Sequence, residues 1–238
     1  MAIKDLRETI EFFTPDLGLD VQPYIDAGIK QGIHHVGRYQ WATMVLVDRK
    51  PGRVVDIACG AGFGSYMLAA AMPHTQIVGV DYDERAVRYA RENYQAPNLE
   101  YRVGDIVRWK SDEVELGGCD AIVSFDTLEH VLHRELAMEC LSNNLTPNGA
   151  LLISTPCGHN ESKLNPGWEH HKVEFSHQDL FRFLSRYFGS VIQPQEREFP
   201  HPEYWRDVIN KGTVRYLNRM NPVVCVEPIR SKPYTQLV

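Results

Sequence analysis

Residues 53–65 read RVVDIACGAGFGS, and this stretch decides the fold of the chain. The β-branched run that starts at Val54 predicts a buried strand of a parallel sheet. Gly60 and Gly62 follow it directly, and an Ala-rich helical pattern then runs over Gly64–Met72. A strand, a glycine turn and a helix in this order bring a ligand against bare backbone at a helix N-terminus. The stretch therefore predicts a binding site for a nucleotide-type ligand.

Strand and helix patterns alternate after this stretch, as in chains built from repeated βα units, which form parallel sheets with right-handed crossovers. Two later strand patterns, about Ser190–Phe199 and Val223–Pro228, fit an antiparallel strand added at one edge. We therefore predict an α/β fold with a doubly wound, mostly parallel seven-stranded sheet, an antiparallel C-terminal strand and helices on both faces. The other predicted elements are strands Arg53–Cys59, Gln76–Asp81, Leu99–Asp105, Ala121–Phe125 and Ala150–Thr155, helices Gly64–Met72, Asp83–Tyr94, His133–Leu145 and Ser176–Tyr187, and a turn at Asn148-Gly149.

The first 50 residues differ from the rest because they read as helices broken by proline and glycine. An amphipathic pattern runs from His34 to Asp48. We predict an N-terminal helical cap over residues 1–50 and one larger domain over residues 51–238. An aromatic insert, residues 199–222, is predicted to interrupt that domain between its last two strands.

The composition limits which partners and which cellular compartment we expect for the chain. The 238 residues carry a formal net charge of −6, so a nucleic-acid partner is not expected. The 5 cysteines are scattered without a C-x-x-C pair, which is typical of reduced thiols in a cytoplasmic protein. The N-terminus has no apolar stretch of signal-peptide type, and no segment reaches membrane-spanning length. We expect a cytoplasmic protein without a membrane span, and the oligomeric state stays open.

Residues around the glycine turn narrow the choice of ligand. Dinucleotide-binding sites use the pattern G-x-G-x-x-G, but Ser65 stands here at the third glycine position. Asp81 ends the next predicted strand, where a carboxylate accepts hydrogen bonds from the ribose hydroxyls of dinucleotides and of other adenosine cofactors alike. Asp56 lies inside the first strand, where dinucleotide-binding sequences usually have an apolar residue. These features favour an adenosine cofactor other than a dinucleotide.

Two further predicted strands end in polar residues. Gly104-Asp105-Ile106 ends the third strand, and residues 124–130, which read SFDTLEH, end the fourth. Together with Asp56 and the glycine turn, these motifs resemble the class I S-adenosylmethionine-dependent methyltransferases over roughly residues 34–190. The resemblance implies a Rossmann-like fold and S-adenosylmethionine as the cofactor. Within that class the chain is similar to O-methyltransferases of bacterial glycan and natural-product modification and of ubiquinone biosynthesis.

The resemblance also implies individual cofactor contacts. The two turn glycines would approach the methionine part, Asp81 would hold the ribose hydroxyls, and Asp105 would read the adenine. In the ubiquinone-biosynthesis type an arginine contacts the cofactor carboxylate, and Arg38 is the candidate here; the alternative for Arg38 is a salt bridge. The predicted cofactor-binding residues are Arg38, Asp56, Gly60, Gly62, Asp81, Tyr82, Asp105, Ile106 and Phe125.

Methyl transfer from a sulfonium is an in-line displacement, and a hydroxyl acceptor needs a base or a metal nearby. An imidazole is the side chain suited to act as a base near neutral pH. His130 and its neighbour Glu129 are therefore the predicted catalytic residues. A structural role stays open, in which both side chains cap the following helix or hold the loop.

The same cluster invites a metal interpretation. Asp126-x-x-Glu129-His130 resembles the E-x-x-E-H cluster that binds a divalent metal in the ubiquinone-biosynthesis enzymes and in small-RNA 3′-terminal ribose methyltransferases, with Asp126 in place of the first glutamate. His171 has a setting similar to that of a later histidine in the RNA enzymes. The predicted metal ligands are Asp126, Glu129, His130 and His171, a set suited to Mn²⁺, Fe²⁺ or Zn²⁺.

The sequence leaves the methyl acceptor open. The leading expectation is O-methylation of a small-molecule hydroxyl, with a sugar or glycan precursor as the favoured substrate class. One alternative is a metal-dependent 3′-terminal RNA ribose 2′-O-methyltransferase, and another is a non-catalytic module that only binds S-adenosylmethionine. Fold and cofactor motifs do not decide between them.

Overall fold

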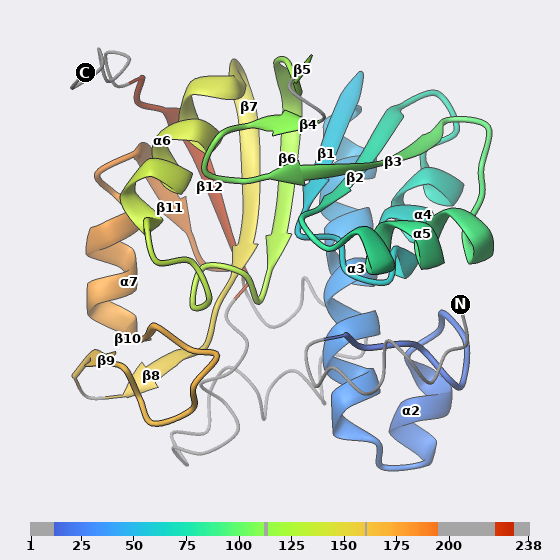
Figure 1. Cartoon of the computed structure of the whole chain (residues 1–238), viewed down its shortest axis with the longest axis horizontal. Helices are drawn as coiled ribbons and strands as arrows, with labels where there is room; N and C mark the ends of the chain where they lie inside the picture. Colours follow the sequence, from blue (N-terminus) through green and yellow to red (C-terminus); the bar gives the residue numbers. More distant parts are fainter. Residues whose placement is uncertain (1–11, 112–113, 160, 195–221, 231–238) are drawn as a thin grey trace.

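The computed structural model describes residues 12–111, 114–159, 161–194 and 222–230. Its main sheet runs in the order β11-β12-β7-β6-β1-β2-β3-β4-β5, with helices grouped around it (Figure 1). The strands of this sheet are β1 Arg53–Ile57, β2 Gln76–Asp81, β3 Leu99–Asp105, β4 Lys110–Ser111, β5 Val114–Glu115, β6 Cys119–Phe125, β7 Leu145–Ser154, β11 Phe188–Ile192 and β12 Val223–Pro228. The helices are α2 Gln22–Asp26, α3 Lys30–Arg49, α4 Phe63–Ala71, α5 Glu84–Asn93, α6 Arg134–Asn144 and α7 His177–Leu184.

Seven of these strands make up the predicted sheet. β1, β2, β3, β6 and β7 pair in parallel, whereas β12 pairs antiparallel with both β7 and β11. The short strands β4 and β5 extend the sheet beyond β3 in antiparallel fashion. The Rossmann-like, doubly wound fold with an antiparallel C-terminal strand is therefore confirmed.

Alternate residues of the central strands face helices on opposite sides of the sheet. Val54 of β1 shares one buried cluster with Trp41 of α3 and Leu68 of α4. Its neighbour Val55 belongs to a second buried cluster together with Met138 of α6. Burying one such aliphatic side chain stabilises a fold by about 1.5–3 kcal/mol. The two cores therefore hold helices against both faces and fix the strand ends that carry the site.

Four strands differ from their predicted bounds. β6 begins earlier, at Cys119, and β11 spans Phe188–Ile192 instead of about Ser190–Phe199. The differences at β1 and β7 have identifiable reasons. β1 ends at Ile57 because Ala58 has a φ of 62°, a left-handed conformation that interrupts the strand. β7 begins at Leu145, and the predicted turn at Asn148-Gly149 lies inside it as an irregularity. Leu145 pairs with Cys119 and the next pair joins Ala150 to Ala121, so residues 146–149 bulge out of register.

A small second sheet follows β7. It has the order β8-β10-β9, with β8 spanning Cys157–His159, β9 Lys163–Leu164 and β10 Val173–Ser176. The loop before β10 is tied to the loop after β6, because the backbone N–H of Lys172 donates to the carbonyl of Glu129 at 2.7 Å. Segments far apart in the sequence thus meet at one end of the main sheet.

The predicted division at residue 50 stays a prediction. In the described part of the cap, α2 and α3 precede β1, and α3 packs beside α4. The predicted insert at 199–222 falls almost wholly on residues 195–221, which lie outside the described residues.

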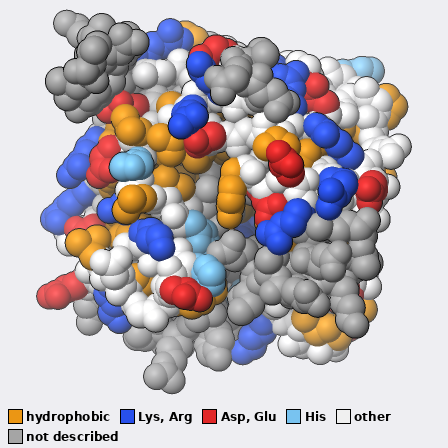
Figure 2. All heavy atoms as spheres, viewed as in Figure 1, with side chains coloured by type: hydrophobic (Ala, Val, Ile, Leu, Met, Phe, Trp, Pro, Cys, Tyr) orange, Lys and Arg blue, Asp and Glu red, His pale blue; other side chains and the backbone are white. Residues whose placement is uncertain are grey.

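Surface features agree with the composition. Among the described residues, no helix combines the length and apolar character that crossing a membrane requires. All 5 cysteines are described and carry free thiols. Figure 2 shows Lys and Arg side chains interspersed with Asp and Glu over the visible face. The described part of that face therefore differs from the single-sign basic surface of a nucleic-acid groove.

Candidate functional site

A cavity of about 570 Å³ opens where β1, β2, β3 and β6 end. Ligands of open α/β sheets bind outside the carboxyl ends of the strands, at this kind of crevice. Asp56, Gly62, Glu129 and His171 are not among the residues that line it. The predicted site residues that do line the cavity are Arg38, Gly60, Asp81, Tyr82, Asp105, Ile106, Phe125, Asp126 and His130.

The glycine turn is held in place by Asp81. Its Oδ2 accepts a hydrogen bond from the backbone N–H of Gly60 at 2.8 Å, and its Oδ1 accepts one from the N–H of Asp83 at 3.0 Å. The Asp81 side chain is buried, and burial raises its pKa to about 6. Gly60 has a φ of 55° and lines the cavity with bare backbone. The end of β2 therefore fixes the shape of the turn.

Gly62 has a packing role in the structure, and its predicted approach to the cofactor stays a prediction. It has a φ of 88°, and an added Cβ would meet the Cβ of Ala90 at 2.4 Å. Its carbonyl accepts a hydrogen bond from the hydroxyl of Tyr101 at 2.8 Å. The absence of a side chain at Gly62 lets α4 begin directly against α5 and β3.

Asp56 differs from its predicted role, because it is fully buried and does not line the cavity. Its carboxylate accepts hydrogen bonds from Ser65 Oγ at 2.6 Å and from the hydroxyl of Tyr39 at 3.1 Å. These bonds join β1 to α3 and α4. Burial raises the pKa of Asp56 to about 7. We conclude that Asp56 supports the glycine turn from inside the fold.

Because the folded state raises the pKa of Asp56 from 3.8 to about 7, it binds this proton more tightly than the unfolded chain does. Stability from this residue is therefore fully present below about pH 4 and is lost as the pH rises toward 7. Asp56→Asn removes that loss, so its free energy of unfolding relative to wild type should rise by about 2–3 kcal/mol between pH 5 and pH 8. Urea unfolding of both proteins at the two pH values measures this. A constant difference would contradict the raised pKa.

The residues predicted for the adenosine lie together along one side of the cavity. Asp105 is half exposed, and its Oδ1 accepts a hydrogen bond from the N–H of Val107 at 2.8 Å. Ile106 follows it, and Tyr82 stands at the rim with 70% of its surface exposed. Phe125 comes from β6 on the other side, with the hydroxyphenyl ring of Tyr39 edge-on at 5.2 Å. Ile106 and Phe125 supply apolar surface, and Asp81 and Asp105 supply carboxylates. This combination suits a purine nucleoside.

Arg38 is engaged by the protein, and its predicted contact with a cofactor carboxylate stays a prediction. Its Nη2 donates to Asp126 Oδ2 at 2.5 Å, and its Nη1 forms an ion pair with Asp126 Oδ1 at 2.5 Å. The same nitrogens reach Ser154 Oγ at 2.7 Å and His35 Nδ1 at 2.9 Å, and Nε donates to the carbonyl of His34 at 3.2 Å. Four hydrogen bonds and the ion pair with Asp126 therefore engage every nitrogen of the guanidinium. The salt-bridge alternative for Arg38 therefore describes this structure.

Asp126 consequently stands apart from the predicted metal ligands. Burial alone would raise its pKa, but the charge and hydrogen bonds of Arg38 hold the pKa below its usual value. The neighbouring His35 is kept neutral, because burial and the charge of Arg38 lower its pKa to about 3. The group of potential metal-binding side chains contains Glu129, His130 and His171 but not Asp126. Its carboxylate is committed to the arginine.

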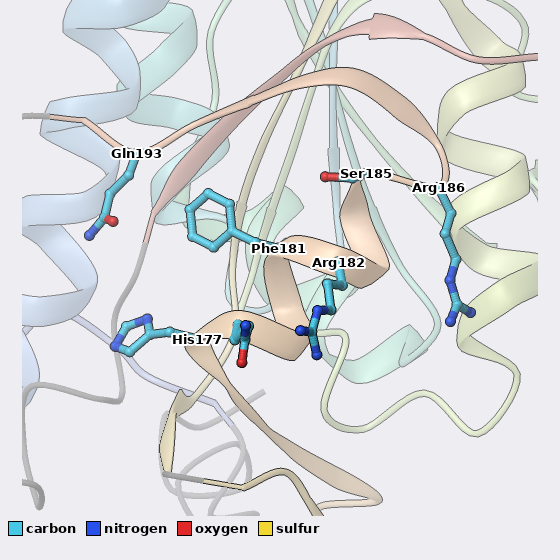
Figure 3. A pocket seen from close by; sticks show the side chains of 7 residues that line it. His177, Phe181, Arg182, Ser185, Arg186 and Gln193 are labelled. Carbon is cyan, nitrogen blue, oxygen red and sulfur yellow. The ribbon is translucent and has the colours of Figure 1, made fainter.

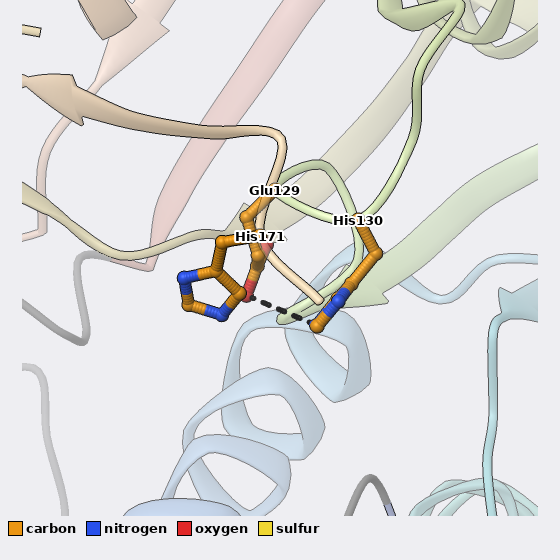
Figure 4. A group of neighbouring side chains, drawn as sticks. All are labelled: Glu129, His130 and His171. Atoms are coloured by element: carbon orange, nitrogen blue, oxygen red, sulfur yellow. Dashed lines mark ion pairs between the residues drawn. The ribbon is translucent and has the colours of Figure 1, made fainter. Parts of the chain in front are cut away.

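Glu129, His130 and His171 do come together as predicted. One ligand atom from each lies within 4.8 Å of the other two (Figure 4). Glu129 Oε1 is 3.9 Å from His130 Nε2, and the ring centroids of the two histidines are 5.0 Å apart. Glu129 and His171 are buried, whereas His130 lines the cavity. We refer to these three residues as the acid–histidine cluster.

Hydrogen bonds donated by Nδ1 orient both rings of the acid–histidine cluster. His130 Nδ1 is 3.0 Å from the carbonyl of His170, and His171 Nδ1 is 2.8 Å from Glu174 Oε1. Both partners are acceptors, so Nδ1 carries the proton in each ring. The Nε2 atoms then have the lone pairs that can bind a metal or accept a proton. A carboxylate behind a histidine is the usual outer partner of a metal-binding imidazole.

Glu129 lacks the surroundings that would stabilise its charge. Thr155 Oγ1 donates to Glu129 Oε2 at 2.8 Å, and both residues are buried. Burial, followed by the nearby negative charge of Asp126, raises the pKa of Glu129 well above its usual value. A cation bound between Glu129 and the two imidazoles would offset this cost. The donor set therefore fits a divalent metal.

Several residues that line the cavity were not predicted from the sequence. Phe12 and Phe13 close one side, and Phe13 stacks on His35 with ring centroids 4.6 Å apart. Only His35 had a usable signal, since it lies three positions before Arg38 and so on the same helix face. Nothing in the local pattern brings Phe12 and Phe13 to the glycine turn.

A second depression lies over α7 (Figure 3). It contains none of the predicted site residues. Its lining residues are His177, Gln178, Phe181, Arg182, Ser185, Arg186 and Gln193.

The fold and the cavity define the class of the protein, an α/β domain that binds an adenosine cofactor at its strand ends. Residues 48–200 match a family model described as a methyltransferase domain. That match covers more than half of the chain, so the chain belongs to this methyltransferase family.

Known proteins support this assignment. A "Probable S-adenosylmethionine-dependent methyltransferase" of Mycolicibacterium smegmatis is 28% identical over 142 residues, which cover 59% of this chain and 51% of that protein. The chain thus spans about half the length of the curated relatives it matches.

Two solved structures show the same fold at low sequence identity. The N-methyltransferase NodS from Bradyrhizobium japonicum, in complex with S-adenosyl-L-homocysteine, has a TM-score of 0.58 and 15% identity over 95% of this chain and 98% of its own. An O-methyltransferase from a trans-AT PKS multienzyme of Brevibacillus brevis, also in complex with S-adenosyl-L-homocysteine, has a TM-score of 0.57 and 12% identity over 90% of this chain and 80% of its own. Because one is an N- and the other an O-methyltransferase, the fold leaves the acceptor atom open.

Proposed function

We propose that this enzyme transfers the methyl group of S-adenosylmethionine to a hydroxyl oxygen of a small molecule. The observation that carries the proposal is the acid–histidine cluster beside the cofactor cavity. An alcohol or sugar hydroxyl is a poor nucleophile until it loses its proton. A cluster with two imidazole Nε2 atoms and a buried carboxylate offers a way to remove that proton.

The residues that line the cavity support one orientation of the bound cofactor. We place the ribose hydroxyls at Asp81 and the adenine between Ile106 and Tyr82, with Asp105 at its edge. The methionine part then lies toward Phe125 and the glycine turn. In this direction the sulfonium methyl faces the end of β6, where His130 lines the cavity. The acceptor oxygen would lie between the sulfonium and the cluster, in line for displacement.

Two modes of hydroxyl activation are open to the same side chains. Without a bound cation, His130 Nε2 accepts the hydroxyl proton as a general base. Glu129, His130 and His171 would alternatively hold Mn²⁺, Fe²⁺ or Zn²⁺, since two imidazoles and one carboxylate suit these ions. A bound cation would supply Lewis-acid activation of the hydroxyl.

The cluster supports a small-molecule acceptor over the other candidates. The RNA alternative rests on a four-ligand set, and Asp126 is paired with Arg38 instead. The net charge of −6 also disfavours a polyanionic substrate. A module that only binds the cofactor would have no use for two oriented imidazoles. A sugar or glycan precursor remains our favoured substrate, in a cytoplasmic setting.

A metal titration tests the second mode. Chelator-treated protein should bind one Mn²⁺ or Zn²⁺ per chain in calorimetry, and His171→Ala should weaken this at least about 100-fold by removing one of three ligands. His74→Ala is the matched control, because His74 is exposed and lies outside the cavity. If neither ion binds and chelator leaves turnover intact, the metal mode is wrong.

The acceptor class needs a separate measurement. Formation of S-adenosylhomocysteine should be followed with panels of monosaccharides and phenols, amines, and carboxylic acids. We expect turnover with the hydroxyl panel. Turnover confined to amines or carboxylic acids would refute O-methylation of a hydroxyl while leaving the cofactor assignment untouched.

A further inference from the structure

The methionine end of the cofactor has charged groups that the cavity must match. S-adenosylmethionine carries an α-ammonium and an α-carboxylate there. Arg38 is already engaged inside the protein, by hydrogen bonds to Asp126, Ser154, His35 and the carbonyl of His34 and by an ion pair with Asp126. Its side chain is also only 1% exposed. A charge contact at this end must therefore come from another residue.

Asp126 has the position and the spare hydrogen-bonding capacity. It directly follows β6 and has a φ of 49°, a left-handed backbone that is uncommon for a residue other than glycine. Its backbone N–H is held by the carbonyl of Ser154 at 2.9 Å, which fixes this turn. The side chain lines the cavity and is 29% exposed. The strained turn thus presents the carboxylate to the ligand.

The bonds that Asp126 already makes leave room for one more. Oδ1 accepts a hydrogen bond from Ser154 Oγ at 3.3 Å and forms an ion pair with Arg38, and Oδ2 accepts a hydrogen bond from Arg38. A carboxylate accepts about four hydrogen bonds, so one acceptor position stays on the cavity side. The other acid near this rim, Glu169, is 86% exposed and pairs with His170 at 3.5 Å. Asp126 is the better placed anion.

We propose that Asp126 binds the α-ammonium group of S-adenosylmethionine, and that Arg38 is a positioning residue that holds the Asp126 carboxylate rigid and ionised. The arginine then acts on the cofactor through the aspartate. Selectivity for ligands with an intact amino-acid end follows, since an ammonium completes a charge-assisted bond that a neutral group cannot.

Ligand analogues test this assignment without using turnover. Calorimetry should compare S-adenosylhomocysteine with 5′-methylthioadenosine, which lacks the amino-acid end, and with the homocysteine analogue that lacks only the α-amino group. Wild-type protein should prefer S-adenosylhomocysteine over the desamino analogue at least about tenfold. Asp126→Asn should weaken S-adenosylhomocysteine by a similar factor and leave the other two ligands within about twofold. Binding of 5′-methylthioadenosine also reports that the variant is folded.

Each contrary result has a distinct meaning. Equal affinity of the wild type for S-adenosylhomocysteine and the desamino analogue would overturn the proposal without any variant. An equal loss for all three ligands in Asp126→Asn would mean that Asp126 only shapes the cavity. If Asp126→Asn instead tightens the two ligands that carry a carboxylate, the released Arg38 binds that carboxylate and the assignment is wrong. Glu169→Gln, which neutralises the exposed acid at the same rim, should stay within about threefold of wild type for every ligand.

Discussion

Alanine in place of His130 is expected to abolish methyl transfer while sparing cofactor binding. His130 belongs to the acid–histidine cluster and also lines the cavity, so it links the two parts of the site. Loss of a general base costs about 10²–10⁴-fold in rate, and loss of a metal ligand would disable the alternative mode. We expect turnover with the best hydroxyl acceptor to fall about 1,000-fold. Affinity for S-adenosylhomocysteine should change less than about threefold.

A second substitution separates chemistry from loop structure. His130 Nδ1 donates to the carbonyl of His170, and this bond helps to join the loop after β6 to the loop before β10. His130→Asn retains an N–H donor near the same position but has no nitrogen that can accept a proton. It should be as inactive as His130→Ala. Normal turnover in His130→Asn would mean that the residue only holds the loop, and lost cofactor affinity in His130→Ala would show that the cavity itself had changed.

Local patterns were sufficient for the fold and for one wall of the cavity. A β-branched run, a glycine turn and an Ala-rich helix each have their own period or backbone requirement, so β1, α4 and the turn between them could be recognised without tertiary information. Asp81 and Asp105 follow from the same reasoning, because parallel strands deliver their C-terminal residues to one edge. The glycine turn lies at the cavity, which Gly60 lines.

Pairings between distant segments could not be derived in this way. Arg38 and Asp126 come from α3 and the end of β6, and their ion pair joins these two distant segments. Asp56 was predicted as a site residue because it places a carboxylate inside a buried strand. In the structure this carboxylate accepts hydrogen bonds from the hydroxyls of Tyr39 and Ser65. A sequence shows that a buried carboxylate needs donors but does not show which side chains supply them.

The acid–histidine cluster contains three of the four residues that the resemblance predicted as metal ligands. Glu129 and His130 are adjacent in the sequence, so any metal motif that includes one includes the other. His171 was predicted only from its sequence context, and the hydrogen bond between Lys172 and the Glu129 carbonyl brings it near. Asp126 matched the motif by spacing alone. Its left-handed backbone turns it toward Arg38, a feature that spacing does not encode.

Asp81→Ala is expected to remove measurable binding of S-adenosylhomocysteine. Asp81 is buried at the cavity wall, where its carboxylate would accept hydrogen bonds from both ribose hydroxyls. Each hydrogen bond to a charged group is worth about 1.5–3 kcal/mol, so losing two weakens binding at least about 100-fold. The variant also leaves the N–H of Gly60 without its acceptor, which loosens the turn that faces the ligand. Calorimetry with S-adenosylhomocysteine measures the combined loss.

Two comparisons separate the affinity lost with the ribose contact from the affinity lost because the glycine turn is loosened. Asp83→Asn is the matched control, because Asp83 is the adjacent acid and its amide replacement can still accept the capping hydrogen bond from the N–H of Arg85. It should bind S-adenosylhomocysteine within about twofold of wild type. An analogue without the 2′- and 3′-hydroxyls should lose less affinity on Asp81→Ala than S-adenosylhomocysteine does, and the remaining loss reports the turn. If Asp81→Ala binds S-adenosylhomocysteine within fivefold of wild type, the ribose contact is wrong. Fivefold corresponds to a free energy on the order of 1 kcal/mol. Removing a buried carboxylate that held two ligand hydroxyls would cost more than that.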